Sequence, residues 1–297
     1  MSNKPRKMTL EKKHNLTGWA FLAPATFLIA VFSFWPMIKA LVLSFQTGKG
    51  RNMQMAGFTN YIRMFQDDVF IQSIKNTFFY FILQVPIMLV VALVLACILN
   101  KKDLRFKGFF RTMIFVPCTT SLVAYSIIFR SLFANDGLVN YVLVNLGILD
   151  KPYNFLTQPF AAKMVILLGL LWRWTGYNMV FFLSGLQNIE YSVYEAAKID
   201  GASAIQTFFK ITVPLLKPTI LLTAIMSTNG TLQLFDESVN LTDGGPANAS
   251  ISMSHYIYNL CFKYVPNFGY AAAMSFFILL LVAVLAFIQM RVGDKRD

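Results

Sequence analysis

The chain has 297 residues, of which 56% are hydrophobic and only 13% are charged. This composition exposes too much apolar surface for one soluble core, so it excludes an ordinary soluble domain and predicts a protein that resides in lipid. The formal net charge of +12 lies in loops between apolar runs, where an anionic lipid leaflet explains it, so we expect no nucleic-acid partner.

Six apolar runs are each long enough to cross a hydrocarbon layer of ~30 Å, which takes ~20 residues of helix. They predict an all-α, polytopic membrane protein with six transmembrane helices. The small residues Ala23 and Ala25 come at the start of the first run, so we expect that run to stay as a span and not to be removed as a signal peptide. The predicted spans are about 18–40, 76–99, 109–129, 163–186, 217–240 and 269–290, within a single transmembrane domain 18–290 that follows an N-terminal segment 1–17 and precedes a tail 291–297.

The basic residues are concentrated on one side of these spans. An excess of Lys and Arg in short loops marks the cytoplasmic side of a membrane protein. We therefore expect both termini, the loop 100–111 and the loop 187–216 to be cytoplasmic. The residues that carry this argument are Lys4, Arg6, Lys7, Lys12, Lys13, Lys101, Lys102, Arg105, Lys107, Arg111, Lys198, Lys210, Lys217, Arg291, Lys295 and Arg296.

An arginine lies midway along the fourth run, between two tryptophans. A charge at that depth is costly, so Arg173 is expected to face the bundle interior or a watery cavity, where it is a functional candidate. The alternative is a structural arginine, paired with Asp236 or Glu237 and held by cation–π contacts with Trp172 and Trp174. Both interpretations stay open at this point.

The polar loop 187–216 predicts two short cytoplasmic helices. Ser192 with Glu195, and Ser203 with Gln206, each fit the S-x-x-E/Q capping box that begins a helix.

A glycine just past a helix can close its last carbonyls in the left-handed conformation, so Gly201, next to Asp200, is predicted to end the first helix. Pro214 and Pro218 are predicted to stop the second helix before the next span.

The fifth run loses its apolar character from Ser227 to Gln233. We expect a helix interrupted there by glycine and amides, which is tolerated only where it meets protein or water, and such places are where transporters bind their cargo. Amides and aromatic faces together suit a neutral, hydroxyl-rich ligand such as a sugar. The candidate substrate-pathway residues are Trp172, Arg173, Trp174, Tyr177, Asn178, Asn229, Gly230 and Gln233.

Other chemistries find little support in the sequence. The segment Gly48–Lys49–Gly50 lacks the upstream glycine and the following hydroxyl of a phosphate-binding loop, so the chain is not expected to hydrolyse ATP by itself. The spans hold no cluster of ionisable residues for a membrane enzyme, a metal site or an ion-driven transporter. We therefore expect a transport subunit that is not an enzyme and has no cofactor of its own.

One set of loop residues resembles the EAA motif of the membrane subunits of bacterial ABC importers, which reads E-A-A, three residues, G, nine residues, I-x-L-P. The matching residues are Glu195, Ala196, Ala197, Gly201, Ile211 and Pro214, with Val213 in the place of the leucine. The resemblance implies that the first loop helix is a coupling helix, seated in a groove of an ATP-hydrolysing subunit. It assigns that role to Glu195, Ala196, Ala197, Asp200 and Gly201.

Segments after the loop resemble carbohydrate-importer permeases of the maltose, lactose and glycerol-phosphate type, and in particular the first of their two dissimilar permeases. These segments are 241–246 (LTDGGP), 256–258 (YIY) and 269–273 (GYAAA). The resemblance implies a bacterial cell-membrane protein that works with a second permease, two copies of an ABC ATPase that bind ATP and Mg²⁺, and an extracytoplasmic solute-binding protein. A sugar or oligosaccharide is the implied cargo, and the chain would form half of an alternating-access pathway. Two alternatives are an importer of glycerol phosphate or another anionic polyol, and a membrane scaffold or sensor without transport.

Overall fold

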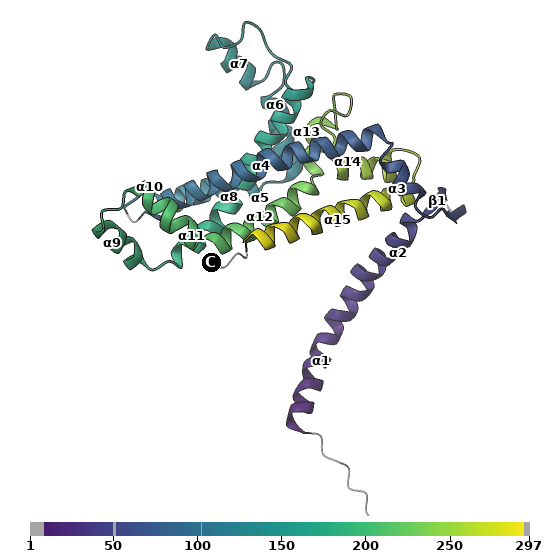
Figure 1. The fold of residues 1–297 in the computed structure, drawn as a ribbon. Helices are drawn as coiled ribbons and strands as arrows, with labels where there is room; N and C mark the ends of the chain where they lie inside the picture. The colour runs from purple at the N-terminus through teal and green to yellow at the C-terminus, as the bar shows by residue number, and fades with distance from the viewer. Residues whose placement is uncertain (1–8, 50–51, 102, 294–297) are drawn as a thin grey trace, which may run out of the picture.

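The computed structural model describes residues 9–49, 52–101 and 103–293. These residues form an almost entirely helical protein, which confirms the predicted fold class (Figure 1). The basic residues at positions 4, 6, 7, 102, 295 and 296, and most of the tail 291–297, lie outside the described residues. The helices are α1 (Leu10–Ile29), η1 (Ala30–Phe34), α2 (Trp35–Ser44), α3 (Thr59–Met64), α4 (Asp68–Asn100), α5 (Lys107–Thr119), α6 (Leu122–Leu132), α7 (Leu138–Asn145), α8 (Pro159–Gln187), α9 (Tyr191–Ile199), α10 (Ala204–Thr207), η2 (Phe208–Thr212), α11 (Val213–Leu215), α12 (Lys217–Leu232), α13 (Asp236–Thr242), α14 (Met253–Tyr258), η3 (Asn259–Lys263) and α15 (Phe268–Gly293).

Four helical segments are long and apolar enough to cross a membrane by themselves: Leu10–Ser44, α4, α8 and α15. Two further segments pass the same test as bent pairs, α5 with α6 at 99° and Ala204–Leu215 with α12 at 70°. If each bent pair is one span, the described residues contain up to six spans. The third and fifth apolar runs are therefore not straight helices, because α5 ends after Pro117 and α12 ends at Leu232.

The centre of the bundle is the pair α4 and α8, flanked by α5 and α12, with α15 packed against α12 (Figure 1). Small residues allow the central helices to approach closely: Ala92 and Ala96 of α4 are fully buried against Met179 and Phe182 of α8. Helix packing of this kind depends on short side chains, since apolar lipid gives little hydrophobic drive for helices to associate.

Gly176 of α8 packs directly on the backbone of α5. A Cβ atom built on it would lie 1.9 Å from the carbonyl oxygen of Ile114. That oxygen belongs to the backbone of α5 and cannot rotate away, so any side chain here pushes two helices apart.

Gly176→Ala is therefore expected to lower the stability of the folded chain by about 1–3 kcal/mol, the usual cost of overpacking. Thermal unfolding in mild detergent measures this effect. Gly108→Ala is the matched control, because a Cβ at Gly108 meets nothing within 4 Å. Equal melting temperatures for the two variants would contradict the prediction.

The helix Leu10–Ser44 lies apart from the bundle (Figure 1). None of the residues in its most apolar window is buried, and only its end, in α2, packs on α15. A hairpin of β1 (Gln46–Lys49) and β2 (Asn52–Met55) follows, paired antiparallel. The buried Asn60 fixes the junction between α2 and β1 by donating to the carbonyls of Ser44 (2.9 Å) and Gln46 (2.8 Å).

Asp67 links three elements at the end of the bundle opposite α9. As the N-cap of α4, its Oδ1 accepts from the N–H groups of Val69 (3.0 Å) and Phe70 (3.2 Å). Its Oδ2 accepts from the hydroxyls of Tyr256 in α14 and Tyr270 in α15, each at 2.7 Å. Burial alone would raise the pKa of Asp67, but these hydrogen bonds outweigh it and lower the pKa from its ordinary value.

The loop 187–216 forms the predicted helix pair, with two differences. The capping box of Ser203 and Gln206 is present, whereas the one predicted for Ser192 and Glu195 is wrong. Helix α9 begins two residues earlier, at Tyr191 with Glu190 as its N-cap, so Ser192 lies inside its first turn, and its hydroxyl donates back to Glu190 (3.4 Å).

The second helix stops between Pro214 and Pro218, before the next span, as predicted, but Pro214 is not itself its end. The helix passes through Pro214 to Leu215 and bends only at Leu216. A π-helical segment, η2, lies directly before this proline, and such a segment accommodates the hydrogen bond and the space that proline takes from a helix. Pro218 lies in the first turn of α12, where it starts a helix.

Gly201 ends α9 as predicted. Its φ is +76°, and its N–H donates to the carbonyl of Lys198 (3.2 Å) while the N–H of Ala202 donates to Ala197 (2.9 Å). This pair of bonds is a Schellman motif, which satisfies the last carbonyls of a helix and sets the direction of the chain that follows.

Candidate functional site

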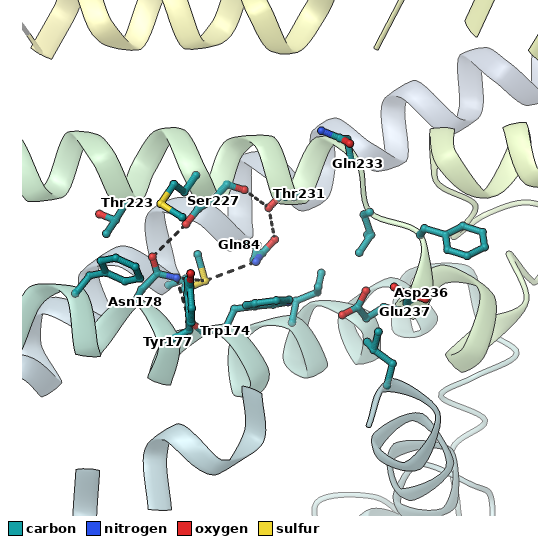
Figure 2. A pocket seen from close by; sticks show the side chains of 18 residues that line it. Gln84, Trp174, Tyr177, Asn178, Thr223, Ser227, Thr231, Gln233, Asp236 and Glu237 are labelled. Carbon is teal, nitrogen blue, oxygen red and sulfur yellow. Dashed lines mark hydrogen bonds between the residues drawn. The ribbon is translucent and has the colours of Figure 1, made fainter. Parts of the chain in front are cut away.

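A cavity of about 310 Å³ lies between α4, α8, α12 and the start of α13. Figure 2 shows the side chains around it: the amides and hydroxyls of α4, α8 and α12 converge at one part, and two carboxylates of α13 lie at the other. Its lining combines aromatic rings, apolar side chains and a few polar groups, the usual make-up of a small-molecule site.

The structure brings five of the eight pathway candidates to this cavity: Trp174, Tyr177, Asn178, Gly230 and Gln233.

The other three candidates, Trp172, Arg173 and Asn229, are not part of the cavity wall. Trp172 projects to the opposite side of α8, where its ring stacks on Tyr125 with centroids 6.0 Å apart. Asn229 is exposed beside the cavity and accepts a hydrogen bond from Gln233.

A chain of hydrogen bonds fixes the polar side chains of the wall. Thr231 donates to Oε1 of Gln84 (2.7 Å), and Ser227 donates to Oδ1 of Asn178 (3.2 Å). Asn178 donates in turn to the carbonyl of Trp174 (3.0 Å). Since each amide is held by a partner, the wall offers polar groups in fixed positions, which is how a site distinguishes hydroxyl-rich ligands.

Sequence reasoning missed Gln84. It is a buried amide in the middle of α4, a helix of otherwise mostly apolar residues. Its position in the sequence already indicates a functional or structural role, because a lone glutamine in a membrane-length apolar run is costly unless it has a polar partner.

The break in the fifth run lies later than the sequence predicts. Helix α12 continues through Asn229 and Gly230 to Leu232, so these two residues do not interrupt it. The break comes at Gln233, the last residue of the predicted segment, and α13 begins at Asp236. The carbonyl of Leu234, freed by this break, accepts from the hydroxyl of Ser252 (2.5 Å), which satisfies the backbone as non-helical segments at membrane depth require.

Arg173 is buried behind the wall, with a relative exposure of 7%. Its guanidinium carbon lies 5.4 Å from the ring centroids of both Tyr125 and Trp174. Its Nε and Nη1 have no hydrogen-bond partner among the described residues. Glu237 of α13, which is itself 4% exposed, lies near enough to interact with the charge of Arg173.

The charged residues of the cavity wall are both acidic. Asp236 and Glu237 line it, and no Lys or Arg is among its lining residues within the part of the chain that the structure describes. The cavity thus has no basic group to pair with an anionic ligand.

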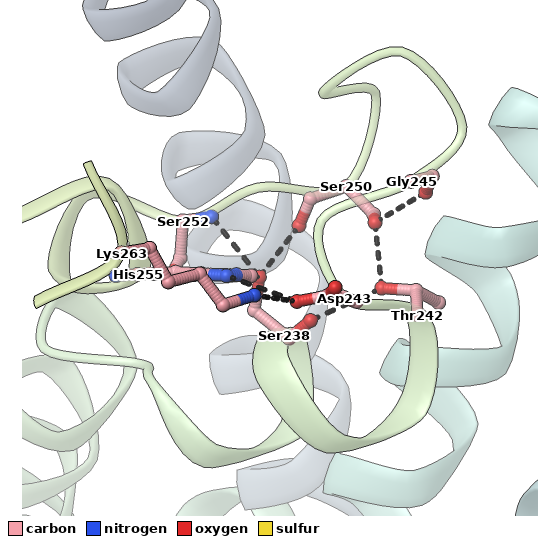
Figure 3. Close-up of polar contacts among 8 residues, drawn as sticks. All are labelled: Ser238, Thr242, Asp243, Gly245, Ser250, Ser252, His255 and Lys263. Carbon is pink, nitrogen blue, oxygen red and sulfur yellow. Dashed lines mark hydrogen bonds and ion pairs between the residues drawn. The ribbon is translucent and has the colours of Figure 1, made fainter. Parts of the chain in front are cut away.

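A polar loop closes the fold beyond α13 (Figure 3). Asp243 has a φ of +49° and pairs with Lys263 at 2.6 Å. His255 is fully buried, with Nδ1 2.9 Å from the hydroxyl of Ser238 and Nε2 3.6 Å from Oδ1 of Asp243. Burial lowers the pKa of His255 to about 4 despite the opposing effect of Asp243, so its ring is neutral at pH 7.

The candidate coupling residues lie at the far end of the bundle, on α9 and its terminus. Glu195, Ala196, Asp200 and Gly201 are exposed, and Ala197 is buried against the bundle.

Large apolar side chains are exposed around these residues. Ile199 is 86% exposed, Ile205 71% and Phe209 64%. Exposed apolar side chains gathered on a polar loop are typical of a protein–protein contact.

A family model described as "Binding-protein-dependent transport system inner membrane component" matches residues 68–296, most of the chain. The chain belongs to this family. It is accordingly a membrane protein with several spans, in agreement with the apolar helices described above.

Curated relatives cover almost the whole chain. The lactose transport system permease protein LacF of Rhizobium radiobacter is 51% identical over 98% of this chain and 98% of its own length. The multiple sugar-binding transport system permease protein MsmF of Streptococcus mutans is 33% identical, covering 97% of this chain and 99% of its own. The arabinooligosaccharides transport system permease protein AraP of Halalkalibacterium halodurans is 30% identical, over 96% and 90%.

A solved structure has the same fold. A chain of a bacterial ABC transporter for import of the acidic polysaccharide alginate superposes with a TM-score of 0.84, covering 96% of this chain and 97% of its own, at 23% identity. At this identity the likeness concerns the fold alone.

Proposed function

We propose that this chain is the permease subunit of an ATP-driven sugar or oligosaccharide importer, in which it forms half of the translocation pathway. The observation that carries the proposal is the cavity: a member of this transport family presents fixed amides and aromatic rings around one cavity between its central helices. Relatives named for lactose, arabinooligosaccharides and multiple sugars support a saccharide cargo.

The chemistry of the wall suits a neutral sugar. The rings of Trp174 and Tyr177 give flat apolar faces for the C–H side of a pyranose, and Gln84 and Asn178 give amide groups for its hydroxyls. An anionic polyol would require a basic partner in the wall, and Arg173 does not reach it. A scaffold or sensor without transport would have no use for such a cavity.

The subunit works with partners. The exposed loop around α9 docks an ABC ATPase, present in two copies, which binds ATP and Mg²⁺; this chain holds no cofactor. The open side of the cavity, where Gly230 and Gln233 are exposed, faces a second permease, and an extracytoplasmic solute-binding protein delivers the sugar at the end opposite α9. The α9 end and both termini are then on the cytoplasmic side.

The proposed mechanism is alternating access driven through the loop. When the ATPases close on nucleotide, they pull α9, and the rigid joint at Gly201 passes the displacement through α10 and α11 to α12. Helix α12 carries Ser227 and Thr231 of the cavity wall, so its movement exposes the cavity to the other side of the membrane.

The test is sugar uptake by the complex that co-purifies with the tagged chain, reconstituted in liposomes with its binding protein. Tyr177→Ala is expected to raise KM for the transported sugar roughly tenfold, because one aromatic contact of about 1–1.5 kcal/mol is lost. Asn229→Ala, outside the cavity wall, is the matched control and should stay within about twofold of the parent. Unchanged uptake by Tyr177→Ala, or a complex without an ATPase, would refute the proposal.

A further inference from the structure

Arg173 has no assigned role in the cavity, although it is the buried charge of α8 nearest to it. It does not line the cavity, it forms no ion pair among the described residues, and two of its nitrogen atoms lack a hydrogen-bond partner. A buried guanidinium left in this condition costs several kcal/mol. Something must compensate for that cost.

The cost of burying Arg173 is offset by aromatic rings and by an acidic group, and Trp174 contacts both Arg173 and that acidic group. The guanidinium of Arg173 lies over the ring of Trp174 and over that of Tyr125, within the ~6 Å range of cation–π attraction. The carboxylate of Glu237, on a different helix, interacts with the Trp174 side chain and with the charge of Arg173. Figure 2 shows the Trp174 ring extending along the cavity wall toward Glu237.

We infer that Arg173 and Glu237 are positioning residues, which hold the Trp174 indole in the orientation in which its face lines the substrate cavity. The inference rests on the proposed function, since it assigns the ring to sugar binding. Arg173 fixes the face of the ring, and Glu237 fixes its N–H edge. The opposite charges attract each other across the α8–α13 contact without forming a direct ion pair, so removing one leaves the other buried with less compensation.

This arrangement explains why a transporter of neutral sugars keeps an intramembrane arginine. The charge does not meet the cargo, and it acts through an aromatic ring that does. A sugar stacked on Trp174 also touches the junction of α8 and α13, so the occupied cavity has a direct contact with the helix that follows the break at Gln233.

The experiment uses the full assembly with Trp174 as its reporter. In this chain Trp19, Trp35 and Trp172 are replaced by phenylalanine, and any tryptophan in the spans of the partner permease is replaced in the same way, so that emission from the membrane domain reports Trp174. Arg173→Met and Glu237→Gln are each expected to shift the Trp174 emission without sugar and to raise KM about tenfold, with kcat within twofold. Arg173→Lys, which keeps the charge, should have a KM between those of the parent and Arg173→Met.

The double variant Arg173→Met/Glu237→Gln tests the pairing. It should assemble better than Arg173→Met alone, because no unpaired charge is left buried. Arg130→Met, an exposed arginine of α6, is the control and should change neither signal.

Parental KM together with parental Trp174 emission in Arg173→Met and Glu237→Gln would overturn the inference. If Arg173→Met does not assemble, the KM and the Trp174 emission of Glu237→Gln and Arg173→Lys test the inference in its place. Absence of saccharide uptake by the parental complex would refute the proposed function instead, and the sugar-free emission of the variants would still decide whether the two charges hold the ring.

Discussion

Gly201→Pro is expected to abolish sugar transport and sugar-stimulated ATP hydrolysis while the chain still inserts in the membrane. Residue 201 needs a φ of +76°, whereas proline is fixed near −65° and has no N–H to donate to Lys198. The Schellman closure of α9 is lost, and α9 and α10 no longer keep their mutual direction. Since a Cβ at this site meets nothing within 4 Å, the effect comes from the backbone and not from a clash.

The chain contains a matched control for this substitution. Helix α7 also ends in a Schellman motif, with Gly147 at a φ of +69° and open space around its Cβ position. Gly147→Pro makes the same backbone change far from α9. Co-purification of the ATPase with each variant measures coupling directly. Two results would contradict the coupling role of the loop. One is a Gly201→Pro variant that keeps both the ATPase and stimulated hydrolysis, and the other is a Gly147→Pro variant that loses them to the same extent.

Asp67→Ala is expected to destabilise the chain by about 3–5 kcal/mol. It removes a helix cap worth ~1 kcal/mol and leaves the hydroxyls of Tyr256 and Tyr270 without their charged acceptor, at about 1.5–3 kcal/mol for each such bond before relaxation. Asp68→Ala is the control, because Asp68 is the adjacent acid in the first turn of the same helix but does not cap it. Denaturation in detergent measures the free energy of unfolding of both variants. An equal loss of stability in Asp67→Ala and Asp68→Ala would contradict the prediction.

The same carboxylate gives a pH dependence with a defined sign. The folded pKa of Asp67 is lowered, so its stabilisation is fully present above the unfolded value of about 3.9 and is lost as the pH falls through the folded value. Asp67→Asn has no such titration. The stability difference between parent and Asn variant should therefore be constant near neutral pH and shrink below about pH 4.

The features that the sequence predicted well are set by local chemistry or by long apolar runs. Gly201 ends α9 because only a residue tolerant of positive φ can take that place, and the Ser203–Gln206 capping box forms among four neighbouring residues. Ser192 fits the same pattern, yet α9 begins at Tyr191. Start positions two residues apart differ little in local energy, and contacts with the rest of the fold decide between them.

The composition of the cavity wall could be predicted only in part. The aromatic and amide residues of α8 were evident, because they interrupt a membrane-length run. Gln84 belongs to a helix 90 residues earlier than the Trp174 turn, so its place beside Thr231 depends on how α4 packs on α12. The sides of α8 that Trp172 and Trp174 face were also undetermined, since both lie in the same turn, and packing against α6 assigns Trp172 to the opposite surface.

The helix Leu10–Ser44 has few contacts with the rest of its own chain. The family model begins at residue 68, where α4 starts, although relatives align over 98% and 97% of this chain and so possess corresponding residues. A helix with no buried neighbours in its own chain must keep its apolar character but not its individual side chains. Exchanges of one apolar residue for another on this helix should therefore cost the chain little stability, whereas each residue of the α4–α8 contact is constrained by the one opposite.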